Sequence, residues 1–469
     1  MRNRALGGYP PVMENAAAAD LDAAASSGLV RGLGLKEATA TNVVQMVGIG
    51  PFITIPFLVS AMGGPQAMLG WLVGAILAVC DGLVWAELGA AMPGAGGSYV
   101  YLREAYGPKT MGRMMSFLFV WMILFTVPLG AASGGVGFAE YMHYLIPTMG
   151  PLTTKVVAVA VILFVTFLAY RDIQSVGRLS FWLMVVVVGS IAWVIVSGLF
   201  RMEFARLFDF PENAFLLRPQ FFTGLGAASL IAIYGYGGYN NVCYLGGEVQ
   251  NPTRTIPRAV ILSILVVVLL YLLMTASILG VVPWQEVVKS QHVVSDFMEM
   301  IYGPWGARGL TLLILGASLA SVFAILLGSS RIPYAAAADG EFFPVFAKLH
   351  PTGRFPHFSL LFLGIGSTVF CFFKLEEIIQ ILIVIQIIIL FLAQVLAVTL
   401  IRRRKEIERP FQMWFYPLPS LTAAVVWLLV LVSTGWRMVG LGVAVLAIGI
   451  GAYMLRARVR KEWPFAASG

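Results

Sequence analysis

The sequence predicts an all-α polytopic membrane protein with about twelve transmembrane helices. Hydrophobic residues make up 59% of the chain and charged residues only 12%, whereas soluble domains carry roughly 25% charged residues. The apolar runs at 262–282 and 378–401 have about the length of 20 residues that an α-helix needs to cross a bilayer. Basic residues gather in alternate loops between such runs, as expected for a chain that crosses the membrane repeatedly.

The apolar runs place the expected spans in chain order. They are expected at 37–62, 66–92, 112–142, 152–170, 179–200, 222–248, 257–282, 308–336, 358–373, 377–401, 414–434 and 436–455. Residues 1–35 hold no run of that length, so we expect a mobile cytoplasmic tail there and no signal peptide. Most of the 31 Lys and Arg residues fall on the side that holds both termini. The positive-inside rule makes that side the cytoplasm, and we expect an integral protein of the plasma (inner) membrane.

Two of these spans are interrupted by glycine well inside the apolar run. The first contains Gly48 and Gly50 followed by Pro51, and the sixth contains Gly235 and the pair 237–238. Such residues free backbone N–H and C=O groups at membrane depth, where only a protein-lined cavity tolerates them. Broken helices in corresponding positions indicate the central site of a transporter, although glycines that merely allow close helix packing are the alternative.

The spacing of the broken helices also predicts the domain organisation. They lie five spans apart, so inverted repeats would cover spans one to five and six to ten. We therefore expect a cytoplasmic tail at 1–35, a transporter core at 36–405, and two accessory helices with a cytoplasmic C-terminal tail at 406–469.

Main-chain groups at the two breaks can hold an amino acid without any charged side chain. The amides around Gly48–Gly50 can bind a carboxylate, assisted by the half-helix dipole. The carbonyls of Val47 and of residues 234–237 can accept hydrogen bonds from an ammonium group. The candidate substrate-binding residues are Met46, Val47, Gly48, Ile49, Gly50, Tyr234, Gly235, Tyr236, Gly237, Tyr239 and Asn240.

Three acidic residues within or beside the spans are candidates for coupling or gating. Asp81 lies inside the second span, where a carboxylate is costly and is a functional hypothesis by default. It is either a proton site or a hydrogen-bonded acid that faces a water-filled cavity. Glu87 and Glu248 lie nearer the cytoplasmic ends, and we expect them to pair with loop arginines such as Arg258 in a structural gate.

Several classes of function are disfavoured by composition. The 3 cysteines lie in apolar segments and the 4 histidines are scattered, so we expect no metal site and no cofactor. We find no paired catalytic acids, Cys–His set or phosphate loop, which argues against an enzyme. The net charge of +8 is explained by the cytoplasmic loops, so no nucleic-acid partner is expected.

Several segments together resemble the amino acid–polyamine–organocation transporter superfamily, especially its L-type amino acid transporters and plant polyamine-uptake carriers. They are GIGPF at 48–52, AELG at 86–89, MPGAGGSYVY at 92–101, YGGYN at 236–240, GEVQNP at 247–252, IPRA at 256–259 and SSR at 329–331. The resemblance covers roughly residues 36–405 and implies the LeuT-type fold, with a 5+5 inverted repeat, and a solute-carrier function. Ile49 departs from the L-type pattern, which usually has Gly-Ser-Gly in helix one.

The resemblance also implies roles for individual side chains. It makes Tyr234 an aromatic gate over the substrate, although a tyrosine packed between helices is the simpler alternative. It places Arg178 near the position that sodium occupies in sodium-coupled relatives, with Ser318 and Ser321 as neighbours. An arginine that extends toward the cytoplasmic interface is the alternative for Arg178.

These observations favour a sodium-independent amino acid transporter that works by exchange or proton symport on neutral L-amino acids. Polyamine uptake is the alternative within transport, but a buried polycation needs carboxylates. The segments 222–247 and 309–338 contain none, although Asp81 and Glu140 remain candidate partners for a polycation. A non-transporting amino acid sensor is the alternative from another class.

Overall fold

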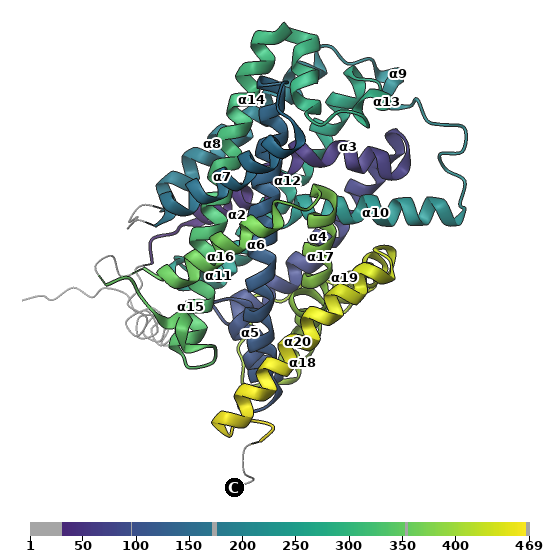
Figure 1. Cartoon of the computed structure of the whole chain (residues 1–469). Coiled ribbons are helices and arrows are strands. Elements are labelled where there is room, and N and C mark those ends of the chain that lie inside the picture. The colour runs from purple at the N-terminus through teal and green to yellow at the C-terminus, as the bar shows by residue number, and fades with distance from the viewer. Residues whose placement is uncertain (1–30, 95, 171–175, 352–354, 466–469) are drawn as a thin grey trace, which may run out of the picture.

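Helices joined by loops make up the described part of the chain (Figure 1). The computed structural model describes residues 31–94, 96–170, 176–351 and 355–465, without the side chains of 176–184. An isolated β-bridge pairs Leu33 with Val249, and the described residues contain no β-strand. The prediction of an all-α polytopic membrane protein is confirmed.

The first five expected spans correspond to helices in the first half of the chain. The elements there are α2 (Leu35–Val47), α3 (Gly50–Met62), η1 (Pro65–Ala67), α4 (Met68–Ala91), α5 (Ser98–Tyr106), α6 (Met111–Leu145), α7 (Pro151–Ala169), α8 (Val176–Leu199) and α9 (Phe204–Leu207). The first expected span is the pair α2 and α3, which are bent by 46° at their junction.

The second half continues with helices at each remaining expected span. Its elements are α10 (Pro219–Tyr236), α11 (Asn241–Tyr244), η2 (Gly246–Glu248), α12 (Pro252–Val281), α13 (Trp284–Val287), α14 (Val293–Ser329), α15 (Arg331–Ala338), η3 (Pro344–Ala347), α16 (His357–Phe370), α17 (Leu375–Gln386), η4 (Ile387–Leu392), α18 (Ala393–Arg403), α19 (Leu418–Ser433) and α20 (Trp436–Arg460). The element η4 is a π-helical turn.

Length and composition confirm repeated membrane crossing. Within the described residues, 7 helices are long and apolar enough to cross a membrane, or 8 if the bent pair α2–α3 is one span. Three shorter apolar helices, Val185–Leu199, His357–Phe370 and Leu418–Ser433, add to these. The eighth expected span, 308–336, covers the part of α14 that follows a kink at Gly303 (φ 71°, ψ −174°) and Pro304, and it continues into α15.

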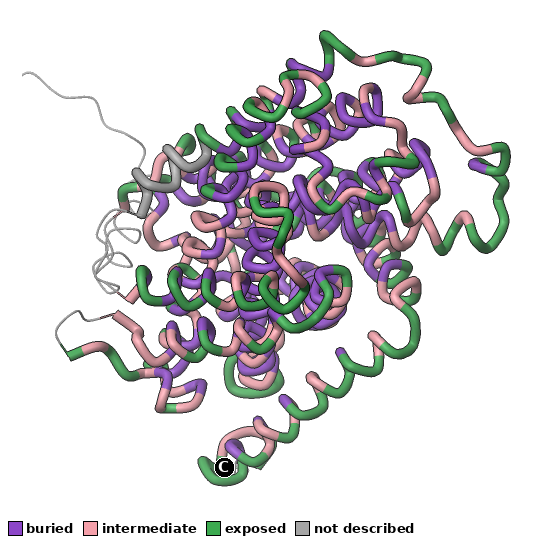
Figure 2. Tube along the Cα trace, turned by 45° about the horizontal axis from the view of Figure 1, so that its top comes forward, coloured by how far each residue is buried: buried purple, intermediate pink, exposed green. Residues whose placement is uncertain are grey.

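The core of the fold surrounds α6, the long central helix in Figure 1. This helix packs against α5, α7, α14, α16, α17 and α20. Buried residues gather in the middle of the bundle, and exposed residues mark its outer faces (Figure 2). The outward side of α7 carries exposed apolar side chains such as Leu152, Val156 and Phe167. A lipid-facing surface is expected to be apolar in this way.

The two broken helices lie beside each other within this core. Helix α3 packs against α10, and α2 packs against α8 and α12. A Cβ built on Gly50 would lie 3.8 Å from Cε1 of Tyr234 and 4.0 Å from Cα of Gly235. The fold therefore brings together two glycine-rich segments that are far apart in the sequence.

Candidate functional site

Both breaks occur where the glycines predict them. Helix α2 ends at Val47, and Gly48 (φ 30°, ψ −135°) turns the chain before α3 begins at Gly50. Helix α10 ends at Tyr236 and is followed by a non-helical stretch, 237–240, in which Gly238 has a φ of 120°. Positive φ is costly for residues that have a Cβ, so glycine at 48 and 238 is a local requirement of the backbone.

The chain also approaches itself closely at these glycines. A Cβ on Gly238 would lie 2.6 Å from Cγ and 3.0 Å from the backbone carbon of Gln45, in α2. A Cβ on Gly48 would lie 2.7 Å from Oγ of Ser321, in α14. Glycine thus permits the two breaks to pack against neighbouring helices as well as to turn.

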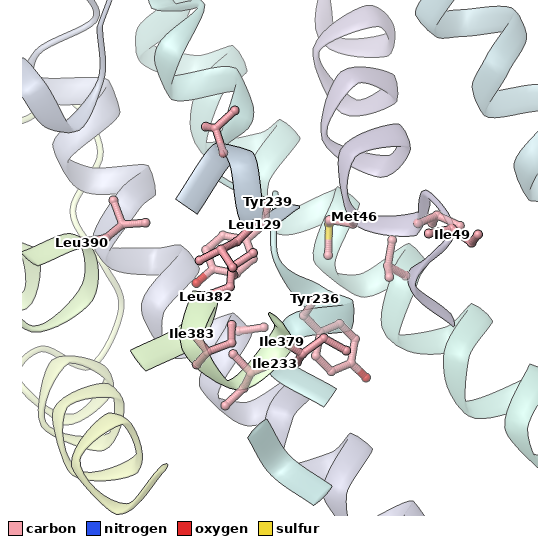
Figure 3. Close-up of a cluster of buried hydrophobic side chains, with 14 of the residues drawn as sticks. Met46, Ile49, Leu129, Ile233, Tyr236, Tyr239, Ile379, Leu382, Ile383 and Leu390 are labelled. Atoms are coloured by element: carbon pink, nitrogen blue, oxygen red, sulfur yellow. The ribbon is translucent and has the colours of Figure 1, made fainter. Parts of the chain in front are cut away.

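A cavity of about 560 Å³ opens between the two breaks and helices α6, α14, α15 and α17. The predicted site residues that line it are Met46, Gly48, Ile49, Gly50, Tyr234, Gly237, Tyr239, Asn240, Glu248 and Ser321. Figure 3 labels Met46, Ile49 and Tyr239 together with two buried aliphatic side chains of α17, Leu382 and Ile383, and all five line the cavity. A single cavity therefore contacts both interrupted helices.

Three of the predicted substrate-binding residues do not line this cavity: Val47, Gly235 and Tyr236. The Tyr236 ring stacks on Tyr271 with ring centroids 5.5 Å apart. Its hydroxyl donates to the Trp71 carbonyl at 3.2 Å. Tyr236 is labelled in Figure 3, and it packs behind the break instead of facing the cavity.

Tyr234, the residue expected to act as an aromatic gate, lies in the last turn of α10. Its side chain lines the cavity. Its hydroxyl and Oγ of Ser133, in α6, are 2.8 Å apart and share a hydrogen bond. The tyrosine thus connects the end of α10 to the central helix, directly beside the first residue of α3.

Asn42 satisfies backbone groups that the second break leaves unpaired. Its Nδ2 donates to the Tyr239 carbonyl at 2.7 Å, and its Oδ1 accepts from the Val242 amide at 2.8 Å. The side chain is fully buried, so no water replaces these bonds. The sequence analysis did not identify Asn42. It could have been found as a polar amide side chain in an apolar helix just before the break, because such side chains form hydrogen bonds between membrane helices.

Two tyrosine hydroxyls donate hydrogen bonds to backbone carbonyls that lack an intrahelical donor because of the breaks or of a proline. The Tyr271 hydroxyl lies 2.9 Å from the Met46 carbonyl and 3.0 Å from the Gly235 carbonyl, and can donate to either. The Tyr141 hydroxyl donates to the Phe52 carbonyl at 2.6 Å. The intrahelical partner of that carbonyl would be residue 56, a proline without an N–H. Sequence reasoning identified neither tyrosine.

The first break leaves both amides and carbonyls without a partner among the described residues, and the carbonyls are those of Val47 and Gly48. The Gly48 amide donates to the Val44 carbonyl at 3.2 Å, whereas the amides of Ile49 and Gly50 have no hydrogen-bond partner among the described residues. Both residues line the cavity. They form the N-terminus of α3, where the helix dipole favours an anion. The Gly235 carbonyl, which we expected to accept from an ammonium group, lies 3.0 Å from the Tyr271 hydroxyl.

Asp81 is a fully buried, hydrogen-bonded acid that does not line the cavity. The Tyr239 hydroxyl donates to its Oδ2 at 2.6 Å. The Trp427 indole, from α19, donates to its Oδ1 at 3.3 Å. The hydrogen-bonded alternative for Asp81 agrees with this geometry, but the cavity that it was expected to face does not reach it.

The expected pairing of the glutamates with arginines is confirmed for Glu87, although its partners are not the Arg258 named as an example. Glu87 is buried and binds Arg402 at 2.6 Å and Arg409 at 3.8 Å, and it also accepts from the Met413 amide at 2.9 Å. Arg258 is exposed and pairs with neither glutamate in the described structure, because the 402–413 segment folds back over the end of α4. Glu248 instead lines the cavity.

The residues expected at the sodium position are only partly described. Arg178 falls in the first turn of α8, but its side chain lies outside the described residues. The Ser318 hydroxyl donates to the Gly134 carbonyl of α6 at 2.9 Å and does not line the cavity. Ser321 lines the cavity directly behind Gly48.

Comparisons with known proteins agree with this arrangement. The branched-chain amino acid permease BcaP of Bacillus subtilis is 23% identical over 93% of this chain and 95% of its own length. The serine/threonine exchanger SteT of the same species is 26% identical over 85% and 89%. The human b(0,+)-type amino acid transporter 1 is 25% identical over 74% and 70%.

A family model described as amino acid permease matches residues 33–454, which include both breaks. The chain therefore belongs to the amino acid permease family, within the amino acid–polyamine–organocation superfamily.

Proposed function

We propose that this protein is a sodium-independent secondary transporter that moves neutral L-amino acids across the membrane by alternating access. The observation that carries the proposal is that the amides of Ile49 and Gly50, at the N-terminus of α3 in the wall of the cavity, have no hydrogen-bond partner among the described residues. A substrate carboxylate can accept from both amides and gain from the helix dipole. The relatives named as amino acid permeases and exchangers support the same substrate class.

The charges around the cavity support a substrate without net charge. The described lining contains one acid, Glu248, and one base, Arg331. A polyamine would bring several cations to this single acid, and unpaired buried cations are costly. Aliphatic residues such as Val127, Ile325 and Leu382 form much of the remaining wall and favour an apolar substrate side chain.

The extent of the cavity supports an inward-open state. It reaches from the breaks to Arg331 and Tyr334 of α15 and to the loop residues Leu349 and Pro356, in segments whose basic residues indicate the cytoplasm. This arrangement agrees with our proposal of a protein of the plasma membrane with cytoplasmic termini. A core at 36–405 that forms a 5+5 repeat, with accessory helices and tails outside it, remains part of the proposal.

Sodium independence and the driving force require a functional test. The sequence position of Arg178 supports sodium independence, because the resemblance implies a cation near the site that sodium occupies in sodium-coupled relatives. Exchange and proton symport are both compatible with the cavity. The serine/threonine exchanger among the relatives supports exchange, whereas symport would need a proton-carrying group.

Uptake into proteoliposomes tests the proposal. Purified full-length protein is reconstituted, and labelled L-leucine, L-serine, L-arginine and putrescine are compared in choline buffer. We expect saturable uptake of the neutral amino acids. Uptake that requires internal amino acid indicates exchange, and accumulation in empty vesicles driven by an inward proton gradient indicates symport.

Other outcomes would contradict the proposal. Saturable putrescine uptake with no amino acid response would identify a polyamine carrier. Amino acid binding with no flux in either vesicle format would identify a sensor.

A further inference from the structure

The buried carboxyl of Asp81 joins three parts of the molecule that are distant in sequence. The acid lies in α4, and its two oxygens accept from different donors: Oδ2 from the Tyr239 hydroxyl at 2.6 Å and Oδ1 from the Trp427 indole at 3.3 Å. Tyr239 belongs to the α10–α11 break and lines the cavity. Trp427 belongs to α19, which lies in the expected accessory region of the chain.

We infer that Asp81 is a positioning residue, which connects α19 to the α10–α11 break and thereby holds the shape of the cavity wall. The effect on substrate affinity rests on the proposed function. The positioning itself is a property of the unliganded protein and can be measured without a substrate.

The non-helical stretch 237–240, which contains Tyr239, is held in place by hydrogen bonds to neighbouring helices. Gly238, directly before Tyr239, has a φ of 120° and little intrinsic stiffness. Tyr239 is fixed at two points: its carbonyl accepts from Asn42 in α2, and its hydroxyl donates to Asp81 in α4. Removing the second contact leaves the ring of Tyr239 free to move within the cavity wall.

Trp427 contacts the cavity wall by a second route. Its ring stacks on Phe391, with centroids 3.9 Å apart and planes 11° apart. Phe391 lies in the π-helical turn η4 and lines the cavity. A displacement of α19 would therefore reach the cavity through Phe391 directly and through the pair Asp81–Tyr239.

The chemistry of the three groups separates positioning from proton transfer. An indole N–H only donates, whereas a tyrosine hydroxyl can donate or accept. In Asp81→Asn, the amide oxygen can face Trp427 and the NH₂ group can donate to Tyr239, so both contacts survive. In Asp81→Leu, both donors lose their acceptor. A positioning role therefore tolerates asparagine, and a proton-carrying role does not.

Hydrogen–deuterium exchange on purified full-length protein tests the inference. We expect the backbone amides of 237–245 to exchange about ten-fold faster in Asp81→Leu and in Trp427→Phe, since one hydrogen bond to a charged group contributes on the order of the 1.4 kcal/mol that a factor of ten represents. Asp81→Asn should exchange as the unmodified protein does.

Trp121→Phe is the matched control. The Trp121 indole donates to the Val445 carbonyl at 3.0 Å and so also joins a core helix, α6, to α20, but Trp121 does not line the cavity. Its replacement should leave exchange of 237–245 unchanged. If Asp81→Leu does not fold, Trp427→Phe decides the test.

The inference is overturned if Trp427→Phe leaves exchange of 237–245 unchanged or if Trp121→Phe raises it equally. It is also overturned if Asp81→Asn behaves as Asp81→Leu does. Binding of L-leucine should weaken about ten-fold in the variants that loosen the segment. If the unmodified protein does not bind L-leucine although the exchange pattern holds, the proposed function fails and the positioning role stands.

Discussion

Replacing Asn42 with leucine tests the physical basis of the second break. The asparagine amide donates to the Tyr239 carbonyl and accepts from the Val242 amide, at 2.7 and 2.8 Å. Leucine has a similar size and is favoured in an apolar helix, but it forms neither bond. Asn42→Leu therefore leaves one carbonyl and one amide without a partner in a fully buried position.

The expected cost follows from these two groups. A buried polar group that loses its partner costs about 1–3 kcal/mol, which gives about 2–6 kcal/mol for the pair. Interhelical side-chain hydrogen bonds in membrane proteins contribute less, about 0.6 kcal/mol on average with a maximum near 1.7. We therefore expect the free energy of unfolding to fall by about 2 kcal/mol, at the lower end of the first range.

Unfolding by SDS in mixed micelles measures this change. Ser263→Ala is the matched control, because Asn42 also donates to Ser263 at 3.3 Å and that bond serves no backbone group of the break. The control should stay within about 0.5 kcal/mol of the unmodified protein. If Asn42→Leu is as stable as the control, the freed backbone groups find other partners and the reasoning is wrong.

Three further predictions concern the cavity. Gly48→Leu should abolish L-leucine binding in folded, monodisperse protein, because its Cβ would lie 2.7 Å from Oγ of Ser321; calorimetry measures binding, and unchanged affinity would mean that the break only serves packing. Tyr234→Ala should reduce the uptake rate about ten-fold or more. Tyr234→Phe loses only the hydrogen bond to Ser133, so it should raise the free-energy barrier to uptake by about 1 kcal/mol or less. Equal uptake rates for the two variants would argue against a gate. Replacing sodium with choline should leave uptake unchanged, and a steep sodium dependence would contradict the role given to Arg178.

Local features of the backbone could be predicted from the sequence. Gly48 and Gly238 both adopt positive φ, a conformation that only glycine reaches at low cost, so their presence in apolar runs located both breaks. The apolar runs located the helices for a different reason, because bilayer thickness sets the length of a membrane-spanning helix. These properties depend on neighbouring residues and can be read from one segment.

The partners of the breaks could not be predicted in this way. Tyr271 reaches the Met46 carbonyl from α12, and Tyr141 reaches α3 from α6, so each contact depends on how distant helices pack. Tyr236 shows the same limit. It adjoins the break in sequence, but its position on the last turn of α10 directs it toward Trp71 instead of the cavity.

The hydrogen bonds at the breaks bear directly on the choice between an amino acid and a polyamine. The carbonyls of Met46, Gly235 and Tyr239 each lie within hydrogen-bond distance of a donor within the protein, whereas the amides of Ile49 and Gly50 have none in the described structure. A polyamine carries donors only, so it cannot accept a hydrogen bond from either of these two amides. An amino acid brings a carboxylate that accepts from those amides, while a carbonyl oxygen that already accepts one bond keeps a second lone pair for the substrate ammonium. We therefore expect the two breaks together to hold both ends of a zwitterion, whereas a ligand that has only cations would leave the amides of Ile49 and Gly50 without an acceptor.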